Sequence, residues 1–242
     1  MNTIKKNERD CAQRPYAIFD MDGTLVDSMV YWNRLGREYL ESKGVTGALE
    51  EVLERIKPMT MTDAAALFRK EFSLAGTAES IAAELNERMA EHYRKDVPLK
   101  SGVRAYLKRL HEEGVTMCVA SSTAEPLMEA CLDRLGVLNA FSFVLSCESV
   151  GAGKDQPDIY LTCAARFGAE PGEIAVYEDM LFAAETAQNA GFYVVGVYDS
   201  HAAADWQALT QITAEQIRDW NQERSEVHER KYCHPSAAKG GE

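Results

Sequence analysis

Residues 16–28 read Tyr-Ala-Ile-Phe-Asp-Met-Asp-Gly-Thr-Leu-Val-Asp-Ser, and this stretch decides how the rest of the chain is interpreted. Its first four residues form a short aromatic and β-branched run, which favours a buried strand over a helix. The run stops at Asp20, and Asp22 and Gly23 follow where turn residues begin. Carboxylates at the end of a strand can share the crevice in which open α/β sheets bind ligands. Because such like charges repel each other, the pattern indicates a bound divalent cation, although Asp is also a common turn residue.

The composition of the chain argues against several classes of function. The chain has 242 residues, 46% of them hydrophobic, which is enough for one large domain or a core with a smaller companion. Its 26 basic and 38 acidic residues give a net charge of −12, which disfavours binding to nucleic acid or anionic membranes. No apolar run reaches membrane-spanning length, and the N-terminus lacks the apolar segment of a signal peptide. We therefore expect a soluble cytoplasmic protein that is a monomer or a weak homodimer.

The six cysteines and the two ends of the chain carry little functional signal. Cys118, Cys147 and Cys163 lie among apolar residues, which predicts small buried hydrophobic side chains rather than disulfides. Residues 1–14 and 225–242 lack apolar periodicity, and we expect a flexible lead-in and a flexible tail. Cys233 and His234 of the tail have the types of metal ligands, but an unstructured tail is the interpretation we favour.

Residues 29–96 lack convincing strands and favour helices. The expected helices cover residues 29–42, 48–56, a segment from 59–62 to about 72, and 77–95. A compact helical block that follows the first strand predicts a separate domain, with hinges near residues 27–29 and 95–101. Its interrupted segment 57–62 is a candidate loop facing the substrate, although an ordinary turn between helices fits equally well.

From Gly102 onward the chain alternates between helices and strands. The expected helices are 103–113, 126–135, 158–167 and 181–189, and the expected strands are 115–120, 141–146, 174–177 and 193–197. This alternation predicts an α/β fold, a Rossmann-like parallel sheet with helices on both faces, built from residues 15–28 and 97–224. Right-handed crossovers bring the carboxyl ends of the strands to one edge. We expect one more helix at 213–223.

Polar residues follow the later strands at that same edge. The sequence Ser-Ser-Thr at 121–123 offers hydroxyls to a phosphate oxygen at a helix N-terminus, although an ordinary N-cap would look the same. Lys154 lies in a glycine-rich loop, where lysine is usually only solvated but where it would offset the charge of a phosphate. Glu178 and Asp179 end the fourth strand and suit a hard cation.

Residues 20–28 resemble motif I of the haloacid dehalogenase-like hydrolases, Asp-x-Asp-Gly-Thr-Leu-x-Asp-Ser, at every defining position. The resemblance implies that Asp20 is a nucleophile that forms an aspartyl-phosphate and that Asp22 is the general acid and base. It also implies that Mg²⁺ lies between Asp20 and the backbone carbonyl of Asp22. Gly23 and Thr24 are then expected to contact the substrate.

The segments after the second and third strands are similar to motifs II and III of this family. Ser121 is implied as the phosphate-binding hydroxyl, with the backbone amides of Ser122 and Thr123 assisting. Lys154 begins Lys-Asp-Gln-Pro-Asp, which resembles Lys-Pro-x-Pro-Asp except that Asp155 replaces the first proline. The resemblance makes Lys154 catalytic.

The end of the fourth strand resembles motif IV, an apolar run followed by Glu-Asp. This implies that Asp179 binds Mg²⁺ directly, while Glu178 acts through water or holds Lys154. Residues 29–96 would be the helical cap of the C1 type found in this family. Lys57 and Thr60 are our candidates for substrate contacts from that cap.

The resemblance covers residues 15–200 and is best to the subgroup of β-phosphoglucomutase and sugar-phosphate phosphatases. The mutase carries a histidine twelve residues after its nucleophile, where this chain has Trp32, and a β-branched apolar residue at the position of Thr24. Asp22 argues against haloalkanoate dehalogenases, and no lysine is singled out for Schiff-base phosphonate chemistry. We therefore expect a Mg²⁺-dependent phosphatase acting on a small phosphorylated metabolite. The alternatives are a phosphosugar mutase and a non-catalytic binding protein.

Overall fold

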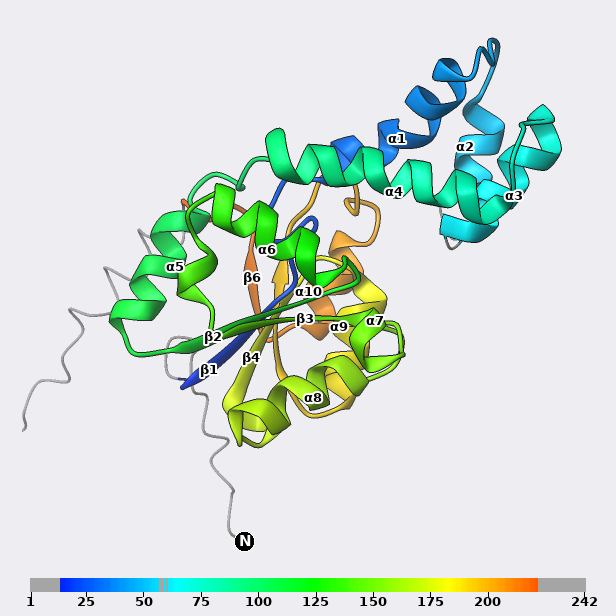
Figure 1. Cartoon of the computed structure of the whole chain (residues 1–242). Helices are drawn as coiled ribbons and strands as arrows, with labels where there is room; N and C mark the ends of the chain where they lie inside the picture. The colour runs from blue at the N-terminus through cyan, green and yellow to red at the C-terminus, as the bar shows by residue number, and fades with distance from the viewer. Residues whose placement is uncertain (1–13, 57–58, 60, 222–242) are drawn as a thin grey trace, which may run out of the picture.

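A six-stranded parallel sheet forms the centre of the molecule, in the order β3-β2-β1-β4-β5-β6 (Figure 1). The computed structural model describes residues 14–56, 59 and 61–221. The strands are β1 (Tyr16–Phe19), β2 (Thr116–Ser121), β3 (Phe143–Ser146), β4 (Ile174–Glu178), β5 (Tyr193–Val197) and β6 (Glu215–Ile217). Because β1 lies between β2 and β4, Asp20 leaves the middle of the sheet at its carboxyl edge. The predicted α/β fold is confirmed.

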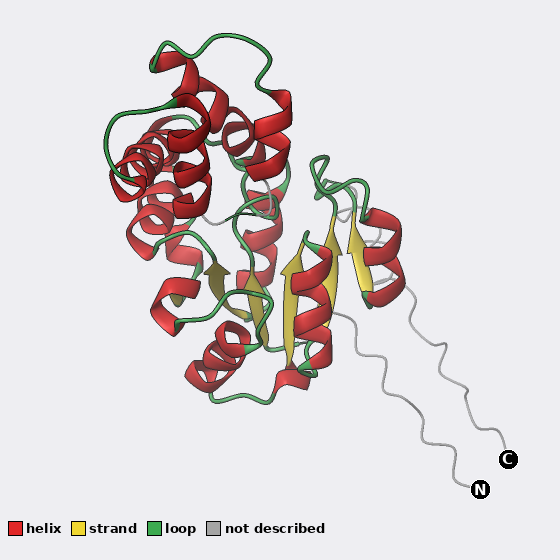
Figure 2. Cartoon of the chain, turned by 90° about the vertical axis from the view of Figure 1, so that its right-hand side faces the viewer, coloured by secondary structure: helices red, strands yellow, loops and turns green. Residues whose placement is uncertain are grey.

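Helices cover both faces of the sheet, as Figure 2 shows. They are α5 (Val103–Glu112), α6 (Glu125–Arg134), α7 (Cys147–Val150), α8 (Asp158–Phe167), α9 (Leu181–Asn189) and α10 (Trp206–Ile212), with 3-10 turns at Leu138–Ala140 and Pro171–Glu173. Phe19 packs into the apolar cluster that contains α5 and α6, and Ile18 into the cluster that contains α8 and α9. Burial on both faces explains why β1 is a continuous apolar run without alternation.

Four helices between β1 and α5 form a block that we call the helical insertion (residues 29–95). They are α1 (Met29–Ser42), α2 (Glu50–Ile56), α3 (Met61–Phe72) and α4 (Ala78–Lys95). In Figure 1, α1 to α3 stand to one side of the sheet, and α4 returns to pack across α6. Thr77 caps α4, since its hydroxyl accepts from the Ser80 N–H. The candidate residues Lys57 and Thr60 lie outside the described residues.

The two segments that join the helical insertion to the sheet lie side by side. The Asp27 N–H donates to the Pro98 carbonyl at 3.0 Å, and the Lys100 N–H donates to the Leu25 carbonyl at 2.9 Å. The hinges expected near 27–29 and 95–101 fall in these segments, and movement about them stays a prediction. The insertion therefore leaves and re-enters the sheet domain at a single place on the carboxyl edge.

The structure corrects the sequence-based interpretation in two places. The helix expected at 213–223 is wrong, because α10 ends at Ile212 and residues Glu215–Ile217 form the edge strand β6. The spacing of Ile217 and Trp220 imitates a helix, but Ile217 lies on the strand that pairs with β5 and Trp220 in the turn after it, and both side chains are buried. Cys147, expected to be buried, is only half-buried because it begins the short helix α7 at the edge of the sheet.

No helix in the described part of the chain combines the length and the apolar character needed to cross a bilayer.

Candidate active site

Four charged side chains from two strand ends and one loop meet at the carboxyl edge of the sheet. Asp20 follows β1, Glu178 ends β4 and Asp179 comes next, while Lys154 reaches in from the loop between α7 and α8. All four residues are buried, at 6% exposure or less. The Lys154 ammonium donates to Asp20 Oδ1 and, at 2.6 Å, to Glu178 Oε1. A single lysine therefore bridges two carboxylates, and the third carboxylate leaves the group with excess negative charge.

The three carboxylates have the arrangement of a site for a hard cation. Oxygens of Asp20, Glu178 and Asp179 all lie within 4.8 Å of one another. Among the described residues, Asp20 Oδ2 and Glu178 Oε2 are buried with no hydrogen-bond partner. Buried polar atoms without partners are costly, and a cation bound by oxygen ligands would satisfy them. The residues present therefore fit Mg²⁺ or a similar divalent ion.

The pKa values of the charged group reflect this crowding. Burial is the main cause that raises the pKa of Asp20 from 3.8 to about 7. The charge of Lys154 lowers this pKa, but the carboxylates of Glu178 and Asp22 raise it, so Lys154 offsets only part of the effect. Burial, followed by the charges of Asp20 and Glu178, also raises the pKa of Asp179. Burial lowers the pKa of Lys154, but Asp20 and Glu178 outweigh it and hold that pKa above its ordinary value. Lys154 is therefore a permanent cation.

The carboxylate of Asp22 is held separately, by hydroxyl groups. Oδ1 accepts from Ser28 Oγ and from Tyr93 Oη, each at 2.6 Å. Oδ2 accepts from Thr123 Oγ1 at 2.7 Å and from Ser121 Oγ at 3.3 Å. This carboxylate does not belong to the group of three that could hold a cation, so a metal contact from Asp22 would come from its backbone carbonyl.

Gly23 and Thr24, expected to contact the substrate, lie against Asp179. Gly23 has a φ of +85°, and a Cβ at this position would collide with Asp179 Oδ2. The Thr24 side chain is fully buried, and its hydroxyl donates to Asp179 Oδ1 at 3.3 Å. The turn after β1 therefore supports one of the candidate metal ligands.

The hydroxyl-rich end of β2 faces Asp22. Ser121 Oγ accepts from the Thr123 backbone N–H at 3.1 Å, so this amide is already oriented toward the site. Ser122 is exposed, and its hydroxyl lies 3.7 Å from Cys147 Sγ. Of these three residues, Ser121 and Thr123 make the direct contacts to Asp22.

Sequence reasoning missed two buried tyrosines at this site. Tyr160 of α8 donates to Glu178 Oε1 at 2.8 Å, and Tyr93 of α4 donates to Asp22. Burial and the facing carboxylate raise the pKa of each tyrosine, so both hydroxyls stay protonated as donors. Neither tyrosine belongs to a local motif, and no signal in the sequence alone could have identified them.

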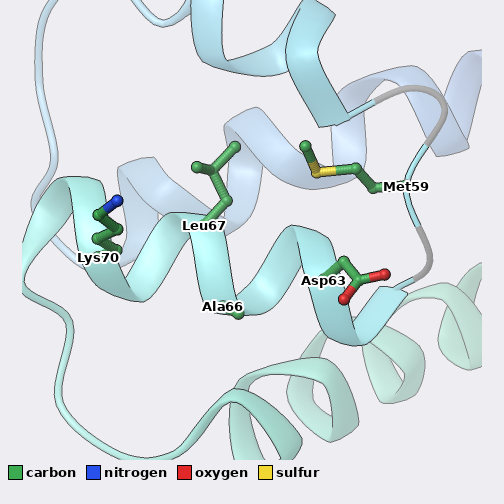
Figure 3. A pocket seen from close by; sticks show the side chains of 5 residues that line it. All are labelled: Met59, Asp63, Ala66, Leu67 and Lys70. Carbon is green, nitrogen blue, oxygen red and sulfur yellow. The ribbon is translucent and has the colours of Figure 1, made fainter.

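A separate pocket lies on the helical insertion and does not include the charged group. Figure 3 shows that it is lined by Met59, Asp63, Ala66, Leu67 and Lys70, four of them on α3. Its lining is mainly apolar, with one acid and one base at its margins.

The chain is similar in sequence to curated phosphatases. Hexitol phosphatase A of Escherichia coli is 30% identical to this chain over 198 residues, 81% of this chain and 87% of the relative. A phosphorylated carbohydrates phosphatase of Thermotoga maritima is 26% identical over 198 residues, 81% of this chain and 90% of the relative.

The fold is likewise similar to that of solved structures. A candidate beta-phosphoglucomutase from Thermotoga maritima superimposes with a TM-score of 0.73 at 23% identity, covering 88% of this chain and 98% of the other. The family model described as haloacid dehalogenase-like hydrolase matches residues 17–197, which include every charged residue of the site. This chain therefore belongs to the haloacid dehalogenase-like hydrolases.

Proposed function

We propose that this protein is a Mg²⁺-dependent phosphatase that hydrolyses a small phosphorylated metabolite, such as a sugar phosphate, through an aspartyl-phosphate. The observation that carries the proposal is the buried group of Asp20, Lys154, Glu178 and Asp179, in which two carboxylate oxygens lack partners. Beside this group lies the carboxylate of Asp22, which is held by hydroxyl groups and not by Lys154. The names of the phosphatase relatives support the class of substrate.

The cation would be held by Asp20, Asp179 and the backbone carbonyl of Asp22, with Glu178 contributing directly or through water. When bound, it would offset the charge of the phosphoryl group and of the carboxylates around it. Gly23 and Thr24 would keep Asp179 in place for this purpose.

Asp20 would act as the nucleophile. One of its carboxylate oxygens forms a bond to phosphorus while the ester P–O bond on the opposite side breaks. Lys154 and the Ser121 hydroxyl would stabilise the charge on the phosphoryl oxygens, with the backbone amides at 122 and 123 contributing. Asp22 donates a proton to the departing oxygen and later takes a proton from the water that hydrolyses the aspartyl-phosphate.

The helical insertion would act as a cap that excludes water during the first step. Its two connections lie side by side, which suits movement about a single hinge. Lys57, Thr60 and the pocket on α3 are our candidates for contacts that select the leaving group.

A mutase is the alternative, and the environment of Trp32 disfavours it. The Trp32 indole N–H donates to Tyr93 Oη at 3.1 Å. Trp32 therefore only donates a hydrogen bond to Tyr93 and, unlike the histidine of the mutase, has no group that titrates near neutral pH.

The proposal is tested by measuring phosphate release from a panel of sugar phosphates, nucleotides and other small esters. The wild type and Asp20→Asn are compared, each with Mg²⁺ and with EDTA. We expect release that needs both Mg²⁺ and Asp20. Isomerisation of a phosphosugar without phosphate release would favour the mutase, and inactivity of the wild type on the whole panel would refute both catalytic functions.

A further inference from the structure

A chain of hydrogen bonds links the helical insertion to the carboxylate of Asp22. The Trp32 N–H of α1 donates to Tyr93 Oη of α4 at 3.1 Å, and Tyr93 Oη donates to Asp22 Oδ1 at 2.6 Å. Tyr93 is fully buried. Because an indole can only donate and a carboxylate can only accept, the direction of both hydrogen bonds is fixed by chemistry.

The end of α4 that carries Tyr93 is attached to the sheet domain. Arg134 of α6 donates through Nε to the Tyr93 carbonyl at 3.0 Å and through its other end to the Val97 carbonyl. A guanidinium at a helix C-terminus also interacts favourably with the helix dipole. The backbone of Tyr93 is therefore fixed to the same domain that carries Asp22, and its hydroxyl keeps a defined position over that carboxylate.

The two oxygens of Asp22 differ in how firmly they are held. Oδ1 accepts two short hydrogen bonds, from Ser28 and Tyr93. Oδ2 accepts a short one from Thr123 and a long one, 3.3 Å, from Ser121. Ser121 is also the hydroxyl assigned to the phosphate, so its contact with Oδ2 is the one that a bound substrate would replace. Oδ2 is then the less firmly held of the two oxygens and the one available to the leaving group of the substrate.

We propose that Tyr93 is a positioning residue for Asp22: it holds Oδ1 so that Oδ2 delivers its proton to the leaving oxygen. This inference rests on the proposed phosphatase function. In the first step an Asp20 oxygen bonds to phosphorus, the ester P–O bond breaks, and the proton on Asp22 Oδ2 passes to the departing oxygen. Asp22 is left as the carboxylate, with Oδ1 still held by Ser28 and Tyr93.

Trp32 makes the orientation of the Tyr93 hydroxyl unique. Tyr93 Oη also lies 3.2 Å from Thr123 Oγ1, so its hydrogen has a second possible acceptor. The Trp32 N–H occupies one side of Oη and leaves the Tyr93 hydrogen directed to Asp22. Loss of this N–H would release the hydroxyl without removing it, so its effect should be smaller than that of removing the hydroxyl.

The test uses the dependence of the first step on the leaving group. An alkoxide from a sugar phosphate needs a proton to depart, whereas para-nitrophenolate departs with little help. Tyr93→Phe should lower kcat/KM for the preferred sugar phosphate about tenfold or more, and for para-nitrophenyl phosphate by less than about threefold. Trp32→Phe should show the same selectivity with a smaller loss, and serves as the second variant should Tyr93→Phe fold poorly.

Two comparisons separate positioning from a general structural effect. Tyr106→Phe removes another buried hydroxyl, one that pairs with Tyr177 Oη at 2.9 Å, and should change neither substrate selectively. In an Asp22→Asn background, Tyr93→Phe should cause no further selective loss, since the effect acts through Asp22.

Equal losses on both substrates, or a selective loss that persists without Asp22, would overturn the assignment of Tyr93 while leaving the phosphatase intact. A wild type that releases no phosphate from any ester would overturn the proposed function and this inference with it.

Discussion

Binding of Mg²⁺ to this site should release protons, because the carboxylates that would hold the ion are protonated more readily than usual. Burial and neighbouring carboxylates raise the pKa of Asp20 from 3.8 to about 7 in the metal-free protein. Below that pH the folded protein carries a proton on Asp20 that the cation must displace. The affinity for Mg²⁺ should therefore fall as the pH falls through about 7.

The size of the effect follows from this pKa. Between about pH 7.5 and about pH 5.5 the deprotonated fraction of a group with a pKa of about 7 falls from about 76% to about 3%. The Kd for Mg²⁺ should rise about 25-fold over this range through Asp20 alone. Because the pKa of Asp179 is also raised, the measured change should be at least this large.

Isothermal titration calorimetry of the metal-free protein with Mg²⁺ measures both the Kd and the protons released, when buffers of different ionisation enthalpy are compared. Glu178→Gln removes a charge that raises the pKa of Asp20, so the transition should move to lower pH. Asp155→Asn changes an exposed carboxylate in the loop of Lys154 and should leave the transition in place. A Kd that stays constant from about pH 5.5 to 7.5, with no proton release, would refute this reasoning.

Two further substitutions test the supports of the site. Gly23→Ala should weaken Mg²⁺ binding about tenfold or more and lower the free energy of unfolding by about 2 kcal/mol, because the new Cβ would collide with Asp179 at a residue whose φ is positive. Calorimetry and denaturant unfolding measure the two effects. Gly172→Ala is the control, because the space around Gly172 is open. Lys100→Met should cost about 3 kcal/mol at neutral pH, since Lys100 lies 2.7 Å from the buried Asp199. That pairing lowers the pKa of Asp199, so the cost should shrink as acid protonates this carboxyl, and equal losses at neutral and acidic pH would contradict the assignment.

The sheet and its charged edge could be predicted because their signals are local. The apolar run at 16–19 and the helices 29–42, 158–167 and 181–189 have the same bounds in the structure as in the prediction. Asp20, Glu178 and Asp179 each follow or end an apolar strand, and Lys154 lies in the glycine-rich loop that comes after the third strand. A parallel sheet collects such positions at one edge. The fold class was therefore enough to predict that these side chains meet, without any knowledge of how side chains pack.

The hydroxyl partners and the C-terminal edge could not be predicted, because they depend on contacts distant in sequence. Tyr93 meets Asp22 across 71 residues, and only because α4 packs on α6 through Arg134. Residues 213–223 have apolar spacing compatible with a helix, and the free edge of β5 decides otherwise by pairing with β6. The local periodicity of a sequence does not predict where a helix packs or whether a strand has a free edge to pair with.

The central position of β1 has a consequence for how the chain folds as it is made. Tyr16 pairs with Thr116 on one side and with Ile174 on the other. Among the described residues, β1 is therefore synthesised about a hundred residues before β2, the first strand that pairs with it, while α1 to α4 can form early from contacts close in sequence. During that interval an apolar strand is without its sheet. We expect the ribosome-bound chain to acquire its helices before its sheet and to be most prone to aggregation until β2 has emerged.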